Sequence, residues 1–207
     1  GIGKSTKDPV LAVLQQSIEA YAGGTLAIAN HLAGLCNEVR LVTQLGDSER
    51  REGFVRGALR SNVEPVLLTK SNSSTIHKRR IVDRYSGNKL LEIYLMQDVL
   101  TAGDDARDLN IALSTAMIGR DVTIVADYGH GMMTPAAIDL LCERAPFFTV
   151  NVQSNAGNRG FNPLSKYRRA DYVCIASHEV QVETRRRAVP PRESVIMMAE
   201  RIICPRF

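Results

Sequence analysis

Asp127 is the residue of this sequence best placed to do chemistry. It ends a mostly β-branched apolar run, 122–126, and the loop 128–131 that follows reads Tyr-Gly-His-Gly. Such a run is typical of a strand covered on both faces, and ligands of α/β proteins bind beyond the carboxyl ends of parallel strands. An acid on a glycine-rich loop there predicts the floor of a binding site. The alternative is that Asp127 only ties down loop amides, and the loop alone does not decide.

A second polar segment follows the next predicted strand, 147–152. The stretch 151–162 is rich in Asn, Gln, Ser and Gly, which predicts a loop at a strand's carboxyl end, as for Asp127. Amide side chains such as Asn151 and Asn155 both donate and accept hydrogen bonds. The segment therefore suits the recognition of a polyhydroxylated ligand.

Cations lie on a different kind of segment, a predicted β-hairpin. Two extended stretches, 75–84 and 90–95, are joined by Tyr-Ser-Gly-Asn-Lys, which is a hairpin signal. Because strand side chains alternate between faces, Lys78 and Arg80 share one face. We predict a lid that brings these cations onto an anionic substrate. The alternative is a solvated edge that resists aggregation.

A glycine pair, Gly23-Gly24, precedes a helix predicted over 25–35. Two glycines let the backbone approach a ligand closely, and the apolar positions that follow recur at helical spacing. Asn30 falls among buried neighbours of this helix, so its amide needs partners. These partners are either backbone groups of the core or the hydroxyls of a bound sugar.

The rest of the pattern alternates strands with helices, which places the polar loops on one sheet edge. Further strands are predicted at 10–20 (with its return), 39–45, 66–68 and 171–176. Helices are predicted at 49–60, 104–119, 134–144 and 195–203. This rhythm implies a parallel sheet. In the helix 49–60, the residues expected to face inward are Phe54, Val55, Ala58 and Leu59.

The composition fits a globular protein with a sizeable core. The chain has 207 residues, 44% of them hydrophobic, which suits one large domain. No apolar run is long enough for a membrane span and no signal pattern opens the chain, so a cytoplasmic protein without a membrane partner is expected. The widely spaced cysteines are expected to be reduced, buried thiols. They are Cys36, Cys142, Cys174 and Cys204.

The net charge of +4 is concentrated in short basic clusters. They lie at 78–80, 168–169 and 185–187, with few aromatic residues and no Trp in the chain. This pattern favours phosphate-bearing small molecules or solvated faces over nucleic acid, so no nucleic-acid partner is expected.

The opening residues 1–6, Gly-Ile-Gly-Lys-Ser-Thr, look like the end of a phosphate-binding P-loop. A P-loop needs a preceding strand and a following helix. Asp8-Pro9 breaks any helix at once, so a P-loop is not predicted.

The order of these motifs resembles that of the PfkB, or ribokinase-like, carbohydrate kinases. The sequence is most similar to the branch that contains the heptose 7-phosphate kinases, the kinase half of ADP-heptose synthases. The resemblance extends from about residue 23 to residue 183. It rests on the Gly23-Gly24 turn with Asn30, the lid sequence Thr75-Ile76-His77-Lys78-Arg79-Arg80, the Asp127 loop and the Ser177-His178-Glu179 segment.

The resemblance implies an α/β fold, a ribokinase-like parallel-sheet sandwich with helices on both faces and a small β lid. The chain 1–207 would be a single, truncated domain of this kind, with the lid inserted at about 70–98. It also implies transfer of the γ-phosphate of ATP, with magnesium, to a sugar hydroxyl.

Site roles follow from the same resemblance. Gly23, Gly24 and Asn30 would line the sugar site. Lys78 and Arg80 would close over it, and the Asp127 loop would border it. Glu179 would help to organise magnesium and phosphates, as a cofactor-binding residue.

The sequence departs from the family at functional positions. The family's Asn three residues before Glu179 is Ala176 here, which leaves the magnesium role of Glu179 open. The family's first strand and its Gly-Ala-Gly-Asp segment, which holds the general base, are not found. No catalytic residue and no metal ligand is therefore assigned, and the chain is expected not to turn over by itself.

Two functions remain open at this point. The first is the substrate-binding part of a sugar or sugar-phosphate kinase. The second is a non-catalytic sugar-phosphate-binding or scaffold module with a kinase-like fold. The sequence does not name the sugar. The exposed edge of the lid also predicts pairing with a second copy of the chain.

Overall fold

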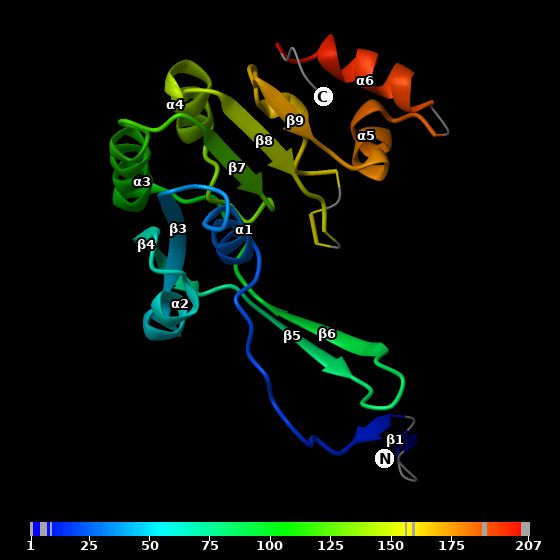
Figure 1. The fold of residues 1–207 in the computed structure, drawn as a ribbon. Coiled ribbons are helices and arrows are strands. Elements are labelled where there is room, and N and C mark those ends of the chain that lie inside the picture. Colours follow the sequence, from blue (N-terminus) through cyan, green and yellow to red (C-terminus); the bar gives the residue numbers. More distant parts are fainter. Residues whose placement is uncertain are drawn as a thin grey trace.

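The computed structural model describes residues 2–4, 8, 10–155, 157–158, 160–187 and 190–203. Within them, parallel sheets are flanked by helices, with an antiparallel hairpin beside them (Figure 1). The predicted α/β class, with helices on both faces and a β lid, is confirmed. Of the P-loop-like opening 1–6, only β1 (Ile2–Lys4) lies within the described residues, and Cys204 lies outside them.

Two parallel sheets form the body of the described chain. In one, β3 (Val39–Ser48) pairs with β4 (Val63–Ser74). In the other, β8 (Phe148–Val152) lies between β7 (Thr123–Asp127) and β9 (Tyr172–Cys174). The predicted parallel pairing is confirmed. Because parallel strands run the same way, the carboxyl ends within each sheet meet at one edge.

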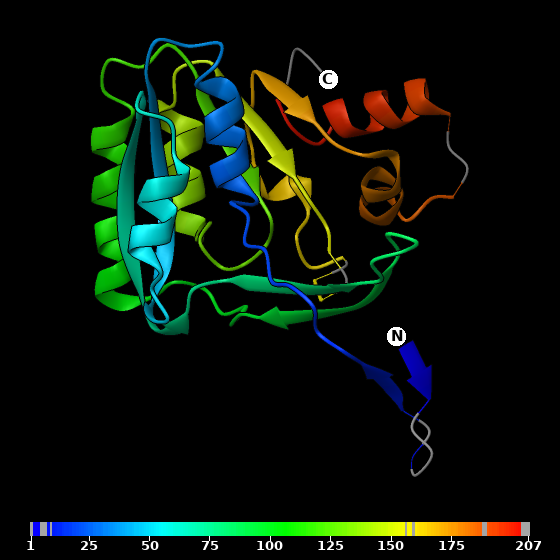
Figure 2. The same cartoon turned by 60° about the horizontal axis from the view of Figure 1, so that its bottom comes forward.

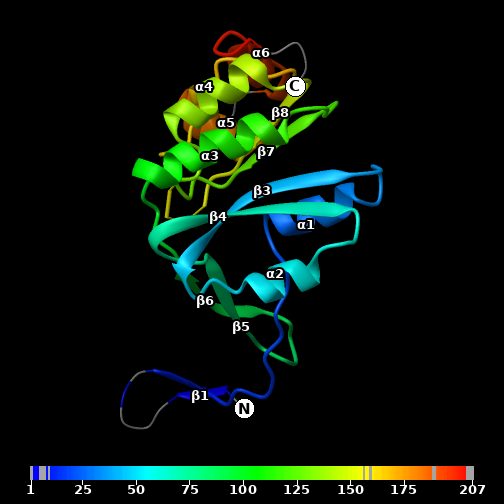
Figure 3. The ribbon, with the colours of Figure 1, turned by 90° about the vertical axis from the view of Figure 1, so that its left-hand side faces the viewer.

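Helices cover the two sides of these sheets. Helices α1 (Thr25–Leu32) and α2 (Glu52–Ala58) lie on one side, and α3 (Gly103–Ala116) and α4 (Pro135–Arg144) lie on the other (Figures 2 and 3). The start of α4 follows from local chemistry, because Thr134 accepts a hydrogen bond from the Ala137 amide (3.2 Å) and Pro occupies the first turn.

The main core lies between α3, α4 and the β7–β8–β9 sheet. Its largest fully buried side chains, each contributing about 1.5–3 kcal/mol by leaving water, come from helices, strands and the segment before β9. They include Leu109, Leu141, Phe148, Val150, Leu164, Tyr167, Val173 and Met198. A smaller cluster of Ala29, Leu41 and Val63 packs α1 onto the β3–β4 sheet.

The predicted hairpin is present as β5 (His77–Val82) and β6 (Lys89–Leu95). Its turn is held by Asp83, whose Oδ1 accepts hydrogen bonds from the amides of Tyr85 (3.1 Å) and Ser86 (2.8 Å). Gly87 has a φ of +69°, which a side chain would strain. The hairpin follows β4 and runs along the edge where the strands end (Figure 2).

Several local predictions differ from the structure. The predicted strand and return at 10–20 is reduced to β2 (Leu11–Val13), which pairs with β1. Residues 177–184, expected only to end a strand, form α5 (Ser177–Thr184), and the last helix, α6, is Pro191–Ala199. A short 3₁₀ turn, η1, spans Leu164–Lys166. A capping carboxylate near the start of α5, described below, explains the missed helix.

Some residues that the sequence predicts to be buried are exposed in the structure. Ile124 in β7 is 44% exposed because the strand alternates, with Val125 and Asp127 on the buried side. Phe54 of α2 is exposed, while Val55 beside it is buried. Of the described cysteines, Cys142 is buried but Cys36 and Cys174 are exposed, so the prediction of buried thiols holds for Cys142 alone among the three.

Candidate functional site

Three parts of the chain meet beyond the carboxyl ends of the strands. The first is the turn before α1, where a Cβ on Gly24 would lie 3.6 Å from the ring of Tyr128 in the loop after β7. That loop is bonded to the segment after β8, because Asn155 Nδ2 donates to the Tyr128 carbonyl (3.1 Å). These two bonded loops form the second part. The third part is the lid stem, the segment that leads from β6 toward α3 and contains Asp98. It approaches the segment after β8, because a Cβ on Gly157 would lie 3.8 Å from the Asp98 carboxylate. This cluster is the candidate site.

Asp127 is a buried structural anchor within this region. Its side chain is 4% exposed. One oxygen, Oδ1, accepts from the Gly129 amide (2.8 Å), and the other, Oδ2, accepts from the Tyr167 hydroxyl (2.7 Å) and pairs with Lys166 Nζ (2.5 Å). The alternative interpretation, that Asp127 ties down its own loop, is therefore the one the structure supports. That Asp127 also binds substrate stays a prediction, and both of its oxygens already have partners inside the protein.

Glycines in the Asp127 loop permit close packing of protein segments against one another. Gly129 has a φ of +70°, and a Cβ there would collide with the side chains of Asn158 and Asn162. Gly131 has a φ of +85°, and a Cβ there would collide with the Val99 carbonyl of the lid stem. Both positions need glycine for conformation and for space.

The amide-rich segment after β8 mainly bonds to the protein. Asn155 Oδ1 accepts from the Gly157 amide (2.9 Å), in addition to the Nδ2 contact with Tyr128. Asn158 Nδ2 donates to the same Tyr128 carbonyl (2.8 Å). Asn151 Nδ2 donates to the Cys174 carbonyl of β9 (2.8 Å). Asn155 therefore lies at the candidate site, whereas Asn151 holds two strands together.

Glu179 has a capping role that the sequence analysis did not predict. The residue is buried, and its Oε1 accepts from the Ser154 amide (2.6 Å) while Oε2 accepts from the Ala176 amide (3.0 Å). The second contact satisfies a backbone donor at the start of α5, which explains why this segment is helical. Because both carboxylate oxygens have backbone partners, the assignment of Glu179 to magnesium and phosphates is not supported by its contacts.

Asn30 bonds to core backbone. Its Nδ2 donates to the Ala58 carbonyl (2.7 Å), and its Oδ1 accepts from the Arg60 amide (2.9 Å). These contacts fasten α1 to the end of α2, so the first of the two alternatives for Asn30 applies. The neighbouring Gly23 differs, because no atom lies within 4 Å of a Cβ built there. The backbone at Gly23 is open to a ligand.

The lid holds its polar side chains together on one face. Lys78 Nζ lies 5.0 Å from the centre of the Tyr94 ring, and Arg80 Nε pairs with Glu92 (2.5 Å). Strand pairing sets Lys78 opposite Tyr94 and Arg80 opposite Glu92, so the predicted shared face is confirmed. Within the part of the chain that the structure describes, these cations form no hydrogen bond or ion pair with Asn30 or Asp127.

Sequence reasoning missed a buried polar group under the lid stem. Lys70, near the end of β4, donates from Nζ to the carbonyls of Gln97 and His130, each at 3.0 Å. His130 Nδ1 lies 2.9 Å from Asp98 Oδ1. Burial lowers the pKa of Lys70, and the Asp98 carboxylate acts in the opposite direction. In the sequence, the burial of Lys70 could have been inferred only from its position close to the apolar run 66–68.

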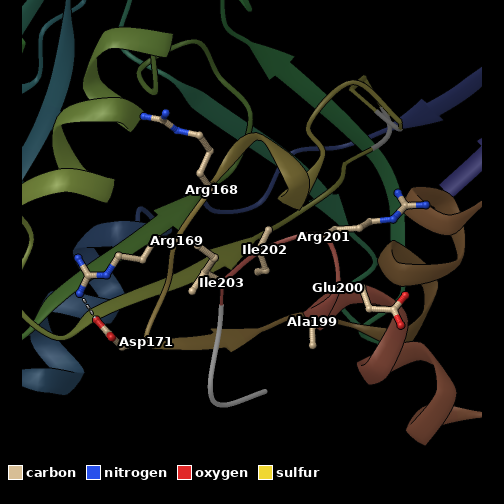
Figure 4. A pocket seen from close by; sticks show the side chains of 8 residues that line it. All are labelled: Arg168, Arg169, Asp171, Ala199, Glu200, Arg201, Ile202 and Ile203. Atoms are coloured by element: carbon tan, nitrogen blue, oxygen red, sulfur yellow. Dashed lines mark hydrogen bonds and ion pairs between the residues drawn. The ribbon is translucent and has the colours of Figure 1, made fainter.

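Two hollows elsewhere on the surface were not predicted. The larger, about 920 Å³, is lined by Arg168, Arg169, Asp171 and residues 199–203 (Figure 4). Its arginines already have partners: Arg169 pairs with Asp171 (2.5 Å), and Arg168 pairs with Asp139 (2.9 Å). The smaller, about 270 Å³, lies between β9, α5 and α6. Neither includes a residue predicted to bind substrate.

Among the described residues, no three His, Cys, Asp or Glu side chains gather as a set of metal ligands. Nor does any described helix combine the length and hydropathy that crossing a bilayer would need.

The sequence is similar to that of known proteins over part of its length. No protein-family model matches it. It is 28% identical over 149 residues to the bifunctional protein HldE of Shewanella denitrificans, covering 72% of the chain and 30% of that protein. It is 30% identical over 129 residues to HldE of Nitrosococcus oceani, covering 62% and 26% respectively. The chain thus spans less than a third of the length of these curated relatives.

Solved structures show the same fold. Phosphofructokinase-2 from Escherichia coli, in complex with fructose-6-phosphate, superimposes with a TM-score of 0.68 at 13% identity, covering 98% of this chain and 66% of that one. A pyrophosphate-dependent kinase in the ribokinase family, complexed with a pyrophosphate analog and myo-inositol, gives a TM-score of 0.56 at 18% identity, covering 88% and 62%. The chain therefore has the ribokinase-like fold. Its sequence is also similar to that of the bifunctional HldE proteins.

Proposed function

We propose that the chain is the acceptor-binding part of an ATP-dependent sugar kinase, and that it binds a sugar phosphate at the edge where its parallel strands end. The observation that carries this proposal is the meeting of the Gly24 turn, the Tyr128 loop and the lid stem at that edge. Crevices beyond the carboxyl ends of parallel strands are the usual ligand sites of α/β sheets.

The chemistry of the cluster suits a hydroxyl-rich anion. Gly23 offers open backbone, and the Tyr128 hydroxyl would lie 4.0 Å from a Cβ on the adjacent Gly24. The lid carries Lys78 and Arg80 on one exposed face, where closure would bring positive charge to a phosphate. The relatives and structural neighbours include a kinase solved with fructose-6-phosphate, which supports a sugar phosphate as the ligand class. A heptose 7-phosphate is the candidate that the motif resemblance favours.

ATP is proposed as the donor in the intact protein. The 207 residues contain no Gly-Ala-Gly-Asp segment. The nearest sequence is Thr101-Ala102-Gly103-Asp104 at the start of α3, where the Asp104 side chain is 83% exposed and pairs with Arg107 (2.9 Å). We therefore expect ligand binding without turnover from this chain by itself.

One observation favours the second candidate, a non-catalytic sugar-phosphate-binding module. The acid that the family pattern would use near magnesium, Glu179, has both oxygens bonded to backbone amides, and its expected companion is Ala176. Both candidates share the acceptor site and differ only in whether phosphoryl transfer occurs.

The test is thermal unfolding of the 207-residue chain with a panel of phosphates. Fructose 6-phosphate, mannose 6-phosphate and a heptose 7-phosphate are compared with inorganic phosphate and with ATP plus Mg²⁺. A ligand at a hundred times its Kd stabilises the folded state by about 2.7 kcal/mol. We expect stabilisation by at least one sugar phosphate beyond that given by inorganic phosphate. If no sugar phosphate raises the unfolding midpoint, the proposed function is wrong.

Turnover separates the two candidates. A coupled assay for ADP with the best-bound sugar phosphate is expected to show none for this chain alone. Release of ADP at an enzymic rate would contradict that expectation and would remove the non-catalytic candidate.

We also propose that the protein is cytoplasmic. Two copies of the chain are proposed to pair through the lid. The hairpin exposes Val82, Leu91 and Leu95, and exposed apolar strands favour partners. Sedimentation velocity of the chain is expected to show a dimer that Leu91→Lys converts to a monomer.

A further inference from the structure

The candidate site contains a buried nitrogen without a partner, and it belongs to His130. The His130 side chain is 9% exposed. Its Nδ1 lies 2.9 Å from Asp98 Oδ1, but its Nε2 is shielded from solvent and has no hydrogen-bond partner within the described residues. Leaving a buried polar atom unsatisfied costs about 1–3 kcal/mol. Such atoms are few in native proteins and call for an explanation.

Asp98 determines which bond Nε2 can make. A carboxylate only accepts hydrogen bonds, so Nδ1 carries the proton that faces Asp98. In the neutral ring, Nε2 is then an acceptor, and the group that complements it is a donor such as a hydroxyl. Lys70 fixes the same residue from another side, because its ammonium donates to the His130 carbonyl (3.0 Å). The ring is thus held by the protein at one nitrogen and is unsatisfied at the other.

The position of His130 connects it to the acceptor site. Its ring stacks near that of Tyr128, with centroids 6.4 Å apart, and the Tyr128 ring is the group that approaches Gly24. Asp98 approaches Gly157 of the segment after β8. The Asp98–His130 pair therefore joins the loop after β7 to the lid stem, and Tyr128 links that loop to the turn before α1.

A second unsatisfied atom lies in the same hydrogen-bonded group. Gln44 Nε2 on β3 is buried without a partner within the described chain, while Gln44 Oε1 accepts from the Thr101 hydroxyl (2.8 Å). Thr101 in turn donates its amide to the carbonyl of Gly131, next to His130 (2.9 Å). An amide that donates and an imidazole that accepts are together the complement of a hydroxyl, which does both.

We propose that His130 binds a hydroxyl of the acceptor sugar phosphate through Nε2, and that Asp98 positions it by holding Nδ1. This inference rests on the proposed function and deepens it, because it assigns a specificity-determining contact in the same site. Asp98 lies on the stem between the lid and α3, so the contact also links the bound sugar to the base of the lid.

The experiment compares His130→Gln and Asp98→Asn with the matched control His31→Gln. His31 lies in the last turn of α1 and is exposed. Isothermal titration with fructose 6-phosphate and with a heptose 7-phosphate gives Kd for each variant. We expect Kd to rise by about tenfold or more in His130→Gln, the effect of losing one well-placed hydrogen bond. Asp98→Asn is expected to weaken binding less, and His31→Gln to leave Kd unchanged.

Nuclear magnetic resonance of the imidazole nitrogens supplies a readout that a merely structural role would not move. The four histidines of the chain are assigned with the same variants. Saturation with the sugar phosphate is expected to shift the ¹⁵N signal of His130 Nε2 and to leave His31 unchanged. Monodeoxy analogues then identify the hydroxyl, since the analogue that lacks it binds equally to the parent chain and to His130→Gln.

The outcomes are distinguishable. If the parent chain binds a sugar phosphate but His130→Gln binds it equally well, or the Nε2 signal does not move, the inference fails and the proposed function stands. The same holds if Nε2 proves to be satisfied by a buried water that remains in the saturated protein. If no sugar phosphate binds the parent chain, both proposals fail.

Discussion

The loops at the carboxyl edge of the sheet and the β5–β6 lid are both rich in polar side chains, but they use them differently. At the edge, Asp127 and Asn162 are buried and bond to the protein itself. On the lid, Lys78 and Arg80 pair with their cross-strand neighbours Tyr94 and Glu92, and the Arg80 side chain is 48% exposed. The edge is built as a rigid frame, whereas the lid keeps its charges accessible.

This difference shows which polar residues remain for a ligand. A buried carboxylate with a cation and a hydroxyl bonded to it gains nothing from moving toward a substrate, because the move would break contacts made at low dielectric. Exposed ion pairs exchange partners at little cost. Ligand contacts are thus expected from the lid and from groups that the frame leaves unsatisfied, such as His130.

The largest predicted effect is loss of the Asp127 anchor. Asp127→Ala leaves Lys166 and the Tyr167 hydroxyl without their shared acceptor, and removing one member of a buried pair costs about 3 kcal/mol or more. Urea denaturation is expected to show this loss in the free energy of unfolding. Because Asp127 reaches the candidate site only through the loop that it holds, a variant protein that remains folded is expected to lose less affinity for a sugar phosphate than His130→Gln does.

Asp104→Ala serves as the control for this comparison. Asp104 is an exposed acid whose pairing with Arg107 belongs to the surface, so its removal is expected to change stability by less than about 1 kcal/mol. If Asp127→Ala were as stable as the parent chain and bound sugar phosphate poorly, Asp127 would be a ligand-binding residue and the frame would be misassigned.

A smaller effect is expected from Tyr167, and it depends on pH. Tyr167 is fully buried, and burial, followed by the Asp127 carboxylate, raises its pKa well above the ordinary value. The unfolded chain loses this proton near pH 10, whereas the folded protein keeps it. The stabilisation is therefore complete below about pH 10 and declines above it by up to about 1.4 kcal/mol per pH unit.

Tyr167→Phe tests this linkage. The variant is expected to lose about 2 kcal/mol below pH 9, the value of one hydrogen bond to a charged group, and to show a shallower decline above pH 10. Lys70, whose pKa is lowered, contributes with the opposite sign in both proteins, so it cancels in the difference. The exposed Tyr85→Phe is the control. Equal alkaline slopes for the parent and Tyr167→Phe would mean that Tyr167 titrates normally.

The fold followed closely from sequence because its signals are local and repeated. The β-branched run before Asp127, the Thr134-Pro135 helix start and the turn at 85–89 each specify an element by backbone chemistry alone. The exception, α5, depends on a contact between Glu179 and the Ala176 amide that also ties in Ser154, 25 residues away. Only the folded chain reveals that Glu179 is a cap.

The candidate site was predicted less well because a polar residue type does not reveal its partner. Asn30, Asp127 and Glu179 all have the chemistry of ligand-binding residues, and all three bond to the protein. That Gly23 and Asn155 bind the ligand stays a prediction; Asn155 bonds to the Tyr128 loop, and the backbone at Gly23 is open. The Asp98–His130 pair joins residues 32 positions apart, and neither local pattern indicates the other.

The smallest effect on stability, and the sharpest test of the lid, comes from its cations. Lys78→Ala and Arg80→Ala are expected to leave the unfolding midpoint unchanged, because their contacts lie on the surface. If closure brings them to a phosphate, each variant should raise the Kd for fructose 6-phosphate by about tenfold, as expected for one charge-assisted hydrogen bond. Arg79→Ala removes the same charge from the opposite face of the hairpin and is the matched control. A similar loss of affinity in Arg79→Ala would mean that the effect comes from long-range charge and not from direct contact. Unchanged affinity in all three variants would mean that the lid is a solvated edge. The contrast between frame and lid would then no longer explain binding.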